Sequence, residues 1–301
     1  MRSGAIILKN NLRETVSSTY SLSVAVYMIL KNWNKKYIIF TGIVLVVITA
    51  IWIVNGRKLP ILFDDCNIAG LTLRGDLMTY LPPESYAEGG QLSIDATASA
   101  ELVRSIEEAG NNDSIKGILL EIDSYGGYPV AAEEVANSLK QSQKPTVALI
   151  RESGASAAYL VATGADWIIA SRNSDIGGIG ITASYVENVE KNKKEGLLFQ
   201  QLSIGKYKDA FDPNKPLTQE EKNLILRDLN VIYENFIEVV SKNRNLPIEV
   251  VKKMADGSTM LGLMALENKL IDEIGGEKEV LTHIESIIHE KPVVCWPQPE
   301  S

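Results

Sequence analysis

Short apolar runs alternate with helical patterns along residues 69–203, and this alternation limits the possible folds more than any other feature of the chain. Residues 117–122 and 145–150 are compact apolar runs bounded by turn residues, which is typical of strands buried inside a parallel sheet. Parallel strands are joined by crossover connections, and these are usually helices. The sequence therefore predicts an α/β fold with a parallel sheet and crossover helices. The predicted strands cover residues 69–77, 117–122, 145–150, 167–170 and 197–203, and the predicted helices cover residues 97–109, 129–139, 156–163 and 183–194.

The last third of the chain is predicted to be helical. Thr218 with Glu221 three residues later forms a capping box, which marks the start of a long helix that runs to about Lys242. Shorter helices are expected at residues 247–254, 261–267 and 278–288. We interpret these helices as an extension of the sheet, so that residues 69–301 form one domain.

Residues 37–54 form a run of 18 uncharged residues. This length is close to the shortest helix that can cross the hydrocarbon core of a membrane. Six Lys or Arg residues precede this run and two follow it directly. The positive-inside rule then predicts a cytoplasmic segment at residues 1–36, one transmembrane helix, a tether at residues 55–68 and an extracytoplasmic domain. In a bacterium that domain would lie in the periplasm or at the cell exterior.

Two other interpretations of the N-terminal region stay open. The apolar run is also consistent with a cleaved signal peptide, although the preceding 36 residues are long for a leader and no small-residue cleavage site follows. Residues 19–30 are fairly apolar but only 12 residues long, which favours an interfacial helix. A second span there would place the domain in the cytoplasm.

Charge and cysteine content exclude some classes of function. The overall net charge is −8 and residues 1–58 carry +7, so residues 59–301 carry −15. This acidity argues against nucleic acid as a partner, because phosphates bind a basic surface. Cys66 and Cys295 are the only cysteines and a disulfide between them is possible. The chain has no Cys/His ligand cluster, so neither a metal nor another cofactor is predicted.

Three local patterns carry possible chemistry, and each has an ordinary structural explanation. Gly126 and Gly127 follow a predicted strand, where a glycine pair allows a tight turn with N–H groups directed at a ligand. Ser156 lies among small residues near a predicted helix start, where free N–H groups favour an oxyanion. A plain strand-to-helix turn explains the glycines equally well, and helix capping by Ser153 or Ser156 explains the serine.

The third pattern is Lys208, 52 residues after Ser156, with Lys206 close by. The only histidines, His283 and His289, lie in the last 19 residues, so a serine hydrolase built on this sequence needs another base. A free lysine has a pKa of about 10.4 and is a poor base at neutral pH, but burial favours the neutral amine. A neutral amine can take the serine proton and return it to the leaving group. Most lysines are simply solvated surface charges.

The three patterns together resemble the signal peptide peptidase A family of serine endopeptidases, in the Clp protease/crotonase superfamily. The resemblance covers roughly residues 68–290 and implies a Clp protease/crotonase-like sheet. Residues 213–221 and 260–276 also resemble family segments. The runs that match the family's three motifs are Ser124-Tyr125-Gly126-Gly127, Ala155-Ser156-Ala157-Ala158-Tyr159 and Gly205-Lys206-Tyr207-Lys208.

The resemblance implies roles for individual residues. Ser156 would be the nucleophile and Lys208 the general base, which is a known variant of triad logic. The N–H groups of Gly126, Gly127 and Ala157 would form the oxyanion hole. An extended peptide substrate would lie along residues 176–181 as an added strand. That segment consists of Ile176, Gly177, Gly178, Ile179, Gly180 and Ile181.

The sequence departs from the family pattern at several positions. Tyr125 replaces a proline, and Ala157 and Ala158 replace glycines. Gly178 stands where the family often has a serine that hydrogen-bonds the lysine. Thr182, Ser184 or a water molecule are candidates to replace that hydroxyl, and the sequence does not choose among them.

The family's serine and lysine tend to come from different copies of the domain in a ring. The resemblance thus implies a homo-oligomer with active sites at subunit interfaces, and a membrane-anchored endopeptidase that cleaves extended apolar peptides such as remnant signal peptides. The competing interpretations are an inactive ring-forming scaffold that lost activity with the missing hydroxyl, and a crotonase-type enzyme acting on acyl-CoA.

Overall fold

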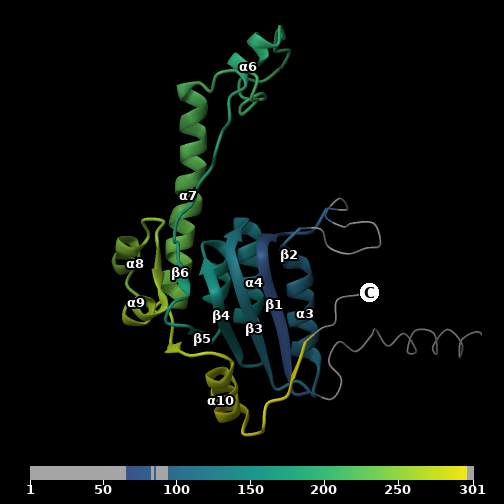
Figure 1. The fold of residues 1–301 in the computed structure, drawn as a ribbon, viewed down its shortest axis with the longest axis vertical. Helices are drawn as coiled ribbons and strands as arrows, with labels where there is room; N and C mark the ends of the chain where they lie inside the picture. The colour runs from purple at the N-terminus through teal and green to yellow at the C-terminus, as the bar shows by residue number, and fades with distance from the viewer. Residues whose placement is uncertain (1–65, 83–84, 86–93, 297–301) are drawn as a thin grey trace, which may run out of the picture. The chain divides into compact units, whose positions relative to one another are not determined.

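The structure is a computed structural model that describes residues 66–82, 85 and 94–296. Its centre is a sheet whose strands follow the spatial order β2–β1–β3–β4–β5–β8 (Figure 1). Every neighbouring pair in this order is parallel, which confirms the predicted parallel sheet. These strands are β1 (Ile68–Met78), β2 (Ala96–Ala98), β3 (Gly117–Gly127), β4 (Thr146–Ala155), β5 (Trp167–Ala170) and β8 (Glu273–Ile274).

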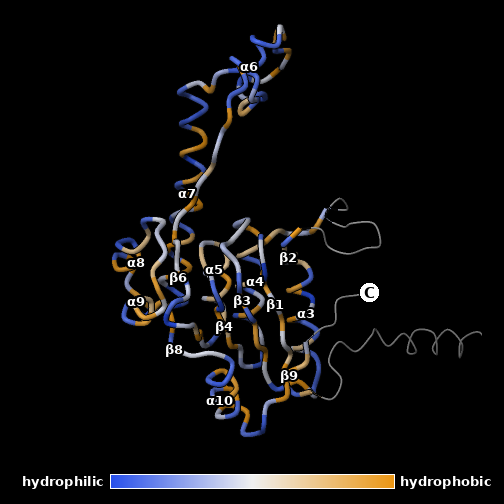
Figure 2. Tube along the Cα trace, in the orientation of Figure 1, coloured by the Kyte–Doolittle hydropathy of each residue, from blue (hydrophilic) through white to orange (hydrophobic). Residues whose placement is uncertain are grey.

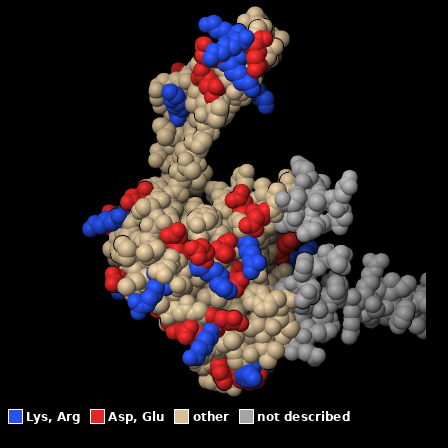
Figure 3. Space-filling model, viewed as in Figure 1, with Lys and Arg blue, Asp and Glu red and all other residues tan. Residues whose placement is uncertain are grey.

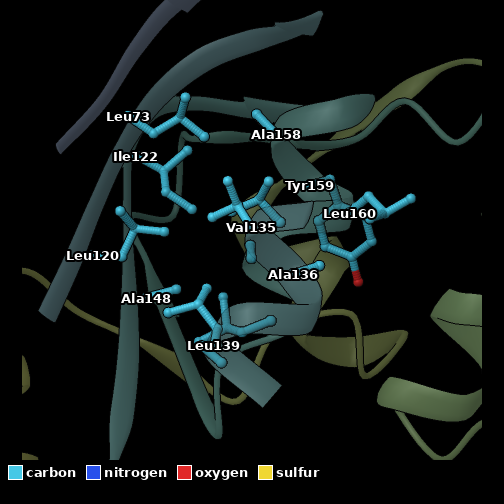
Figure 4. Packing of buried hydrophobic residues seen from close by; sticks show 14 of the residues in the cluster. Leu73, Leu120, Ile122, Val135, Ala136, Leu139, Ala148, Ala158, Tyr159 and Leu160 are labelled. Carbon is cyan, nitrogen blue, oxygen red and sulfur yellow. The ribbon is translucent and has the colours of Figure 1, made fainter. Parts of the chain in front are cut away.

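Helices cover both faces of the sheet, because alternate strand residues are apolar on each side. Leu120 and Ile122 of β3 pack with α3 (Ser99–Asn111), α4 (Pro129–Gln141) and α5 (Ala157–Ala162) in one cluster. Figure 4 shows strand side chains of this cluster facing those of α4 and α5. On the other face, Leu119 and Leu149 pack with α10 (Glu277–Ile288). Each fully buried Leu or Ile of this kind contributes roughly 1.5–3 kcal/mol.

Three short strands lie outside this order. Strand β6 (Asp175–Gly177) is parallel to β4 and antiparallel to β7 (Thr259–Leu261). Strand β9 (Val294–Cys295) pairs with the start of β1. Beside that pairing, Cys66 and Cys295 form a disulfide with a Cα–Cα distance of 5.7 Å. The bridge that the sequence left open is therefore present, and it ties the two ends of the described chain together.

The C-terminal helices include α7 (Gln219–Asn243), α8 (Ile248–Met254) and α9 (Gly262–Glu267). The capping box is confirmed: Thr218 accepts from the Glu221 N–H, and the Glu221 carboxylate accepts from the Thr218 N–H. Hydrophilic and hydrophobic residues alternate along α7 (Figure 2). Only the C-terminal half of α7 buries apolar side chains, at Phe236, Ile237 and Val240.

The base of α7 is held by a charged cluster. Arg244 donates to both carboxylate oxygens of Asp272, at 3.0 and 2.7 Å, and to the Lys269 carbonyl at 3.1 Å. Asp272 also accepts from the Ile168 N–H of β5 at 2.8 Å. Tyr159 of α5 donates to the nearby Leu270 carbonyl at 2.8 Å, and burial raises the pKa of its phenol, which keeps it a donor.

Two predictions of secondary structure were wrong. Residues 197–203 form no strand, because they have no partner strand in the described chain and are largely exposed. The helix predicted at residues 183–194 is only α6 (Val189–Lys194). Before α6 the chain forms no helix. The Tyr185 hydroxyl lies within hydrogen-bond distance of the Asp212 and Lys215 carbonyls, and the Asn188 N–H donates to the Pro213 carbonyl.

The predicted transmembrane helix at residues 37–54, the cytoplasmic segment and most of the tether lie outside the described residues. Among the helices of the described part, none combines the length and hydropathy that spanning a bilayer requires.

Candidate active site

Ser156 lies at a strained turn between β4 and α5. Its backbone has φ 52° and ψ −125°, a conformation that non-glycine residues rarely adopt. The turn is held because Ser156 N–H donates to the Gly177 carbonyl at 2.7 Å, and the Ser156 carbonyl accepts from Leu160 N–H at 3.0 Å. A strained strand-to-helix turn of this kind presents a serine hydroxyl at the edge of a sheet.

The Ser156 hydroxyl does not cap α5, although capping was the ordinary explanation for a serine at this position. Ser153, the other candidate cap, is fully buried on β4, and its hydroxyl has no hydrogen-bond partner in the described structure. Ser156 is half-buried. Its hydroxyl is therefore available for another role.

Two glycines from other segments pack directly against Ser156. A Cβ on Gly126 would lie 2.9 Å from Ser156 Cβ and 3.0 Å from the Ala157 nitrogen. A Cβ on Gly178 would lie 3.2 Å from the Ser156 nitrogen. Gly178 also has φ 59°, so a serine there would be strained. The missing family hydroxyl thus coincides with a backbone conformation that favours glycine.

Two of the predicted oxyanion donors, Gly126 and Ala157, lie beside the serine, but not every predicted donor is free. Ala157 is the first residue of α5, so its N–H has no acceptor within the helix. Gly127 is the last residue of β3. The N–H of the residue after it, Tyr128, donates to the Leu77 carbonyl at 2.8 Å. The Gly126 N–H donates to Ser124 Oγ at 3.0 Å. Ser124 was expected only as part of the glycine-turn motif, and nothing in the sequence indicated this bond.

The predicted substrate segment, residues 176–181, is partly paired with the chain itself. Ile176 and Gly177 belong to β6 and lie between β4 and β7. Gly178 N–H donates to the Ser258 carbonyl, and the Ile179 carbonyl accepts from Gly257 N–H. These pairings involve residues 176–179, so the rest of the predicted substrate segment begins at Gly180.

Lys208 lies in a different part of the structure. It belongs to residues 182–218, here called the lysine segment, which includes α6 and leads into α7. Figure 1 shows α6 at the end of α7 that points away from the sheet. Lys208 is exposed, and no hydrogen bond joins it to Ser156 within the described residues. The described part of one copy thus shows no bond between the two residues.

The neighbouring Lys206 is engaged in an ion pair. Its ammonium lies 2.6 Å from the Glu220 carboxylate and 5.1 Å from the centre of the Tyr207 ring. The hydrogen bond with Glu220 raises the pKa of Lys206, which makes it a poorer base. Of the two lysines, Lys208 is thus the better candidate.

The lysine segment leaves large apolar side chains in solvent. Leu198, Leu202 and Ile204 are 82%, 95% and 99% exposed. The segment carries six lysines and five acids, a net charge of +1, whereas residues 59–301 together carry −15. Figure 3 shows blue side chains gathered over α6 with red ones beside them, and mixed charges on the body of the domain. Thr182 and Ser184, the candidates to replace the family hydroxyl, are exposed at the start of this segment.

Comparison with known proteins agrees with the motif assignment. The family model for peptidase family S49 matches residues 138–289, about half of the chain and a range that contains both Ser156 and Lys208. A candidate protease of Methanocaldococcus jannaschii is 34% identical over 184 residues, which are 60% of this chain and 59% of that protein. A candidate signal peptide peptidase SppA of Enterococcus faecium is 30% identical over 179 residues, which are 58% of this chain and 52% of that protein.

The chain thus matches a little more than half the length of these relatives. Among solved structures, a ClpP1 mutant of Listeria monocytogenes matches with a TM-score of 0.46 and 10% identity, over 70% of this chain and 92% of that one. The family-model match extends over half the sequence and includes the strained serine turn. The chain belongs to peptidase family S49, and its resemblance to the signal peptide peptidase A family is confirmed.

Proposed function

We propose that the chain is a membrane-anchored serine endopeptidase that uses Ser156 as nucleophile and Lys208 as general base. The observation that carries this proposal is the strained turn at Ser156, whose hydroxyl is not used as a helix cap, within a region that matches a peptidase family. Structural serines at helix starts usually cap the helix, and strained backbone is common at catalytic sites.

Hydrolysis would proceed through an acyl-enzyme. The neutral amine of Lys208 takes the proton from Ser156 Oγ as the oxygen attacks the peptide carbonyl. The N–H groups of Ala157 and Gly127 stabilise the oxyanion, while the Gly126 N–H stays bonded to Ser124 Oγ. The amine then gives its proton to the leaving nitrogen, and water enters to release the acyl group by the same steps.

A second copy of the chain would supply the lysine. In a single copy Lys208 is exposed, on a segment with solvent-exposed leucines that another subunit would cover. Covering it would also remove water from the amine and favour its neutral form. The active enzyme is then a homo-oligomer with an active site at each interface.

The substrate would be an extended apolar peptide, such as a remnant signal peptide. Because residues 176–179 are paired within the chain, a substrate strand would add to the backbone from Gly180 onward. Residues 37–54 would anchor the enzyme where such peptides leave the bilayer. The Cys66–Cys295 disulfide supports an extracytoplasmic domain, since disulfides persist in oxidising compartments.

Peptide hydrolysis by the full chain tests the proposal. Ser156→Ala and Lys208→Ala should each lower kcat about 10⁴-fold or more, as removal of members of a catalytic unit does. Lys206→Ala should stay within about twofold of the parent, because loss of an exposed ion pair has small effects. Ser153→Ala is the matched control: it removes a buried hydroxyl without a partner three residues before the nucleophile.

A fluorophosphonate that labels serine nucleophiles separates the competing explanations. Labelling of the parent and of Ser153→Ala, but not of Ser156→Ala, supports the peptidase. If neither labelling nor hydrolysis occurs in the parent, the inactive scaffold that the glycine at 178 suggests is the better explanation. Loss of activity in Lys206→Ala with full activity in Lys208→Ala would reassign the base.

A further inference from the structure

Ser124 is a buried serine whose hydroxyl bonds two backbone groups beside the candidate active site. Its side chain is fully enclosed, with 2% of the residue exposed. The hydroxyl donates to the Gly75 carbonyl at 2.5 Å and accepts from the Gly126 N–H at 3.0 Å. One hydroxyl thus connects β1 with the end of β3, where the glycine turn begins.

Both strands are irregular at the points that this hydroxyl joins. The β1–β3 register shifts between Arg74 and Asp76, around Gly75, and Gly75 has φ 59°. The β3–β4 register shifts between Ile122 and Ser124. Bulges take backbone groups out of the ladder, and they are common next to active sites, where they redirect a segment. The Ser124 hydroxyl gives the Gly75 carbonyl a donor and the Gly126 N–H an acceptor. Without these partners, burying the two backbone groups would cost free energy.

The segment that Ser124 holds lies against the nucleophile. Gly126 has φ 121°, and its Cα packs so closely that an added Cβ would be 2.9 Å from Ser156 Cβ. Ser124 itself pairs with Gly154 of β4, two residues before Ser156. A shift of the Gly126 peptide would therefore change the position of the turn relative to both Ser156 and the Ala157 amide.

We propose that Ser124 is a positioning residue for peptide hydrolysis: its hydroxyl fixes the Gly126–Gly127 turn against Ser156 and so sets the geometry of the oxyanion site. This inference rests on the proposed function. It assigns Ser124 no contact with substrate. A misplaced oxyanion donor weakens binding of the transition state much more than binding of the substrate, so the effect belongs in kcat rather than in KM.

The test is steady-state hydrolysis by the full chain with substitutions at Ser124. Ser124→Ala should lower kcat by about 10- to 100-fold and change KM by less than about threefold, because sub-ångström misplacement of catalytic groups is costly. The Ki of a peptide boronate, which mimics the tetrahedral oxyanion, should rise by the same factor as kcat/KM falls. All rates are compared at a temperature where circular dichroism shows each variant folded.

Ser124→Thr and Ser124→Val form a second pair, which differs in a hydroxyl but hardly in shape. Their kcat ratio isolates the hydroxyl even if Ser124→Ala does not fold, and the threonine variant should be at least about tenfold faster. Thr146→Val is the matched stability control. Thr146 is as buried as Ser124 and lies at the start of β4, at the end of the strand far from Ser156. Its hydroxyl also donates one hydrogen bond and accepts one, both with Asp166. Its kcat should stay within about twofold of the parent.

The outcomes separate this inference from the proposed function. An active parent whose Ser124→Ala and Ser124→Val variants keep or increase kcat overturns the positioning role alone. So does an equal loss in Thr146→Val, which would indicate a general effect of stability. A parent that neither hydrolyses peptides nor labels at Ser156 overturns the proposed function and this inference with it.

Discussion

The turn that carries Ser156 and the segment that carries Lys208 differ in almost every physical respect. Ser156 lies between β4 and α5, held by backbone hydrogen bonds and packed against Gly126 and Gly178. Lys208 is exposed in the lysine segment, which pairs with no strand of the described chain. The first region is complete within one copy of the chain, whereas the second leaves apolar side chains in solvent. Under the proposed function, the fold of one copy preorganises Ser156, whereas Lys208 needs a further contact to act as its base.

Under the proposed function, a single chain does not suffice for catalysis. We expect co-expression of Ser156→Ala with Lys208→Ala to restore about a quarter of the parent activity, because a quarter of randomly formed interfaces pair an intact serine with an intact lysine. Peptide hydrolysis by the purified mixed assembly measures this. Mixing Ser156→Ala with the Ser156→Ala/Lys208→Ala double variant is the control and should restore nothing. No recovery in the first mixture would mean that each site is built within one chain.

The junction between the sheet domain and α7, the helix that follows the lysine segment, is the Arg244–Asp272 pair. Arg244→Met should lower the melting temperature of the full chain by roughly 6–12 °C, because it leaves the partly buried Asp272 carboxylate without its guanidinium partner, at a cost of about 3 kcal/mol. Arg227→Met is the control on the same helix. Its pair with Asp228 is 65% and 62% exposed, so the melting temperature should change little. Equal shifts would show that the junction does not depend on this pair.

The smallest effect is expected at the start of α7. A hydrogen bond from Lys215, followed by those from Thr218, lowers the pKa of Glu221 from its ordinary 4.5 to about 2. Because the folded pKa is the lower one, the ionised carboxylate stabilises the fold fully above about pH 4.5, and this contribution is lost as the pH falls toward 2.

Melting temperatures of the parent and Glu221→Gln across this pH range measure the effect. The difference between the two should be largest at neutral pH and disappear toward pH 2. Glu220→Gln alters an exposed pair with Lys206 and should show a weaker dependence. A difference between parent and Glu221→Gln that does not vary with pH would contradict the assigned cause.

Sequence patterns predicted the elements of the sheet domain well, because apolar periodicity and burial coincide there. Strand β5 and the capping box at Thr218 lie where they were predicted. Strands β3 and β4 continue to Gly127 and Ala155, beyond their apolar runs, since pairing with neighbours extends a strand past its hydrophobic positions. The strand predicted at 197–203 is absent for the converse reason: its apolar residues have nothing to pair with in one copy.

For the candidate site, too, some features could be predicted from the sequence and others could not. The motifs made Ser156, Lys208 and the glycine turn candidates, because these short runs resemble the family's three motifs. They did not reveal the bond between Ser124 and Gly126, or that residues 176–179 are already paired. These features depend on strands that are distant in the sequence and on bulges that shift their register.

Local patterns were enough to predict the class of fold, since it follows from apolar periodicity, and the resemblance of three short motifs was enough to indicate the family. The tertiary structure decided which groups of those motifs are free to react. It placed Ser156 in a strained turn without a capping bond, directed the Gly126 amide to Ser124, and left Lys208 in solvent. The physical reason is that hydrogen-bond partners and burial arise from contacts between distant segments, which no local pattern encodes.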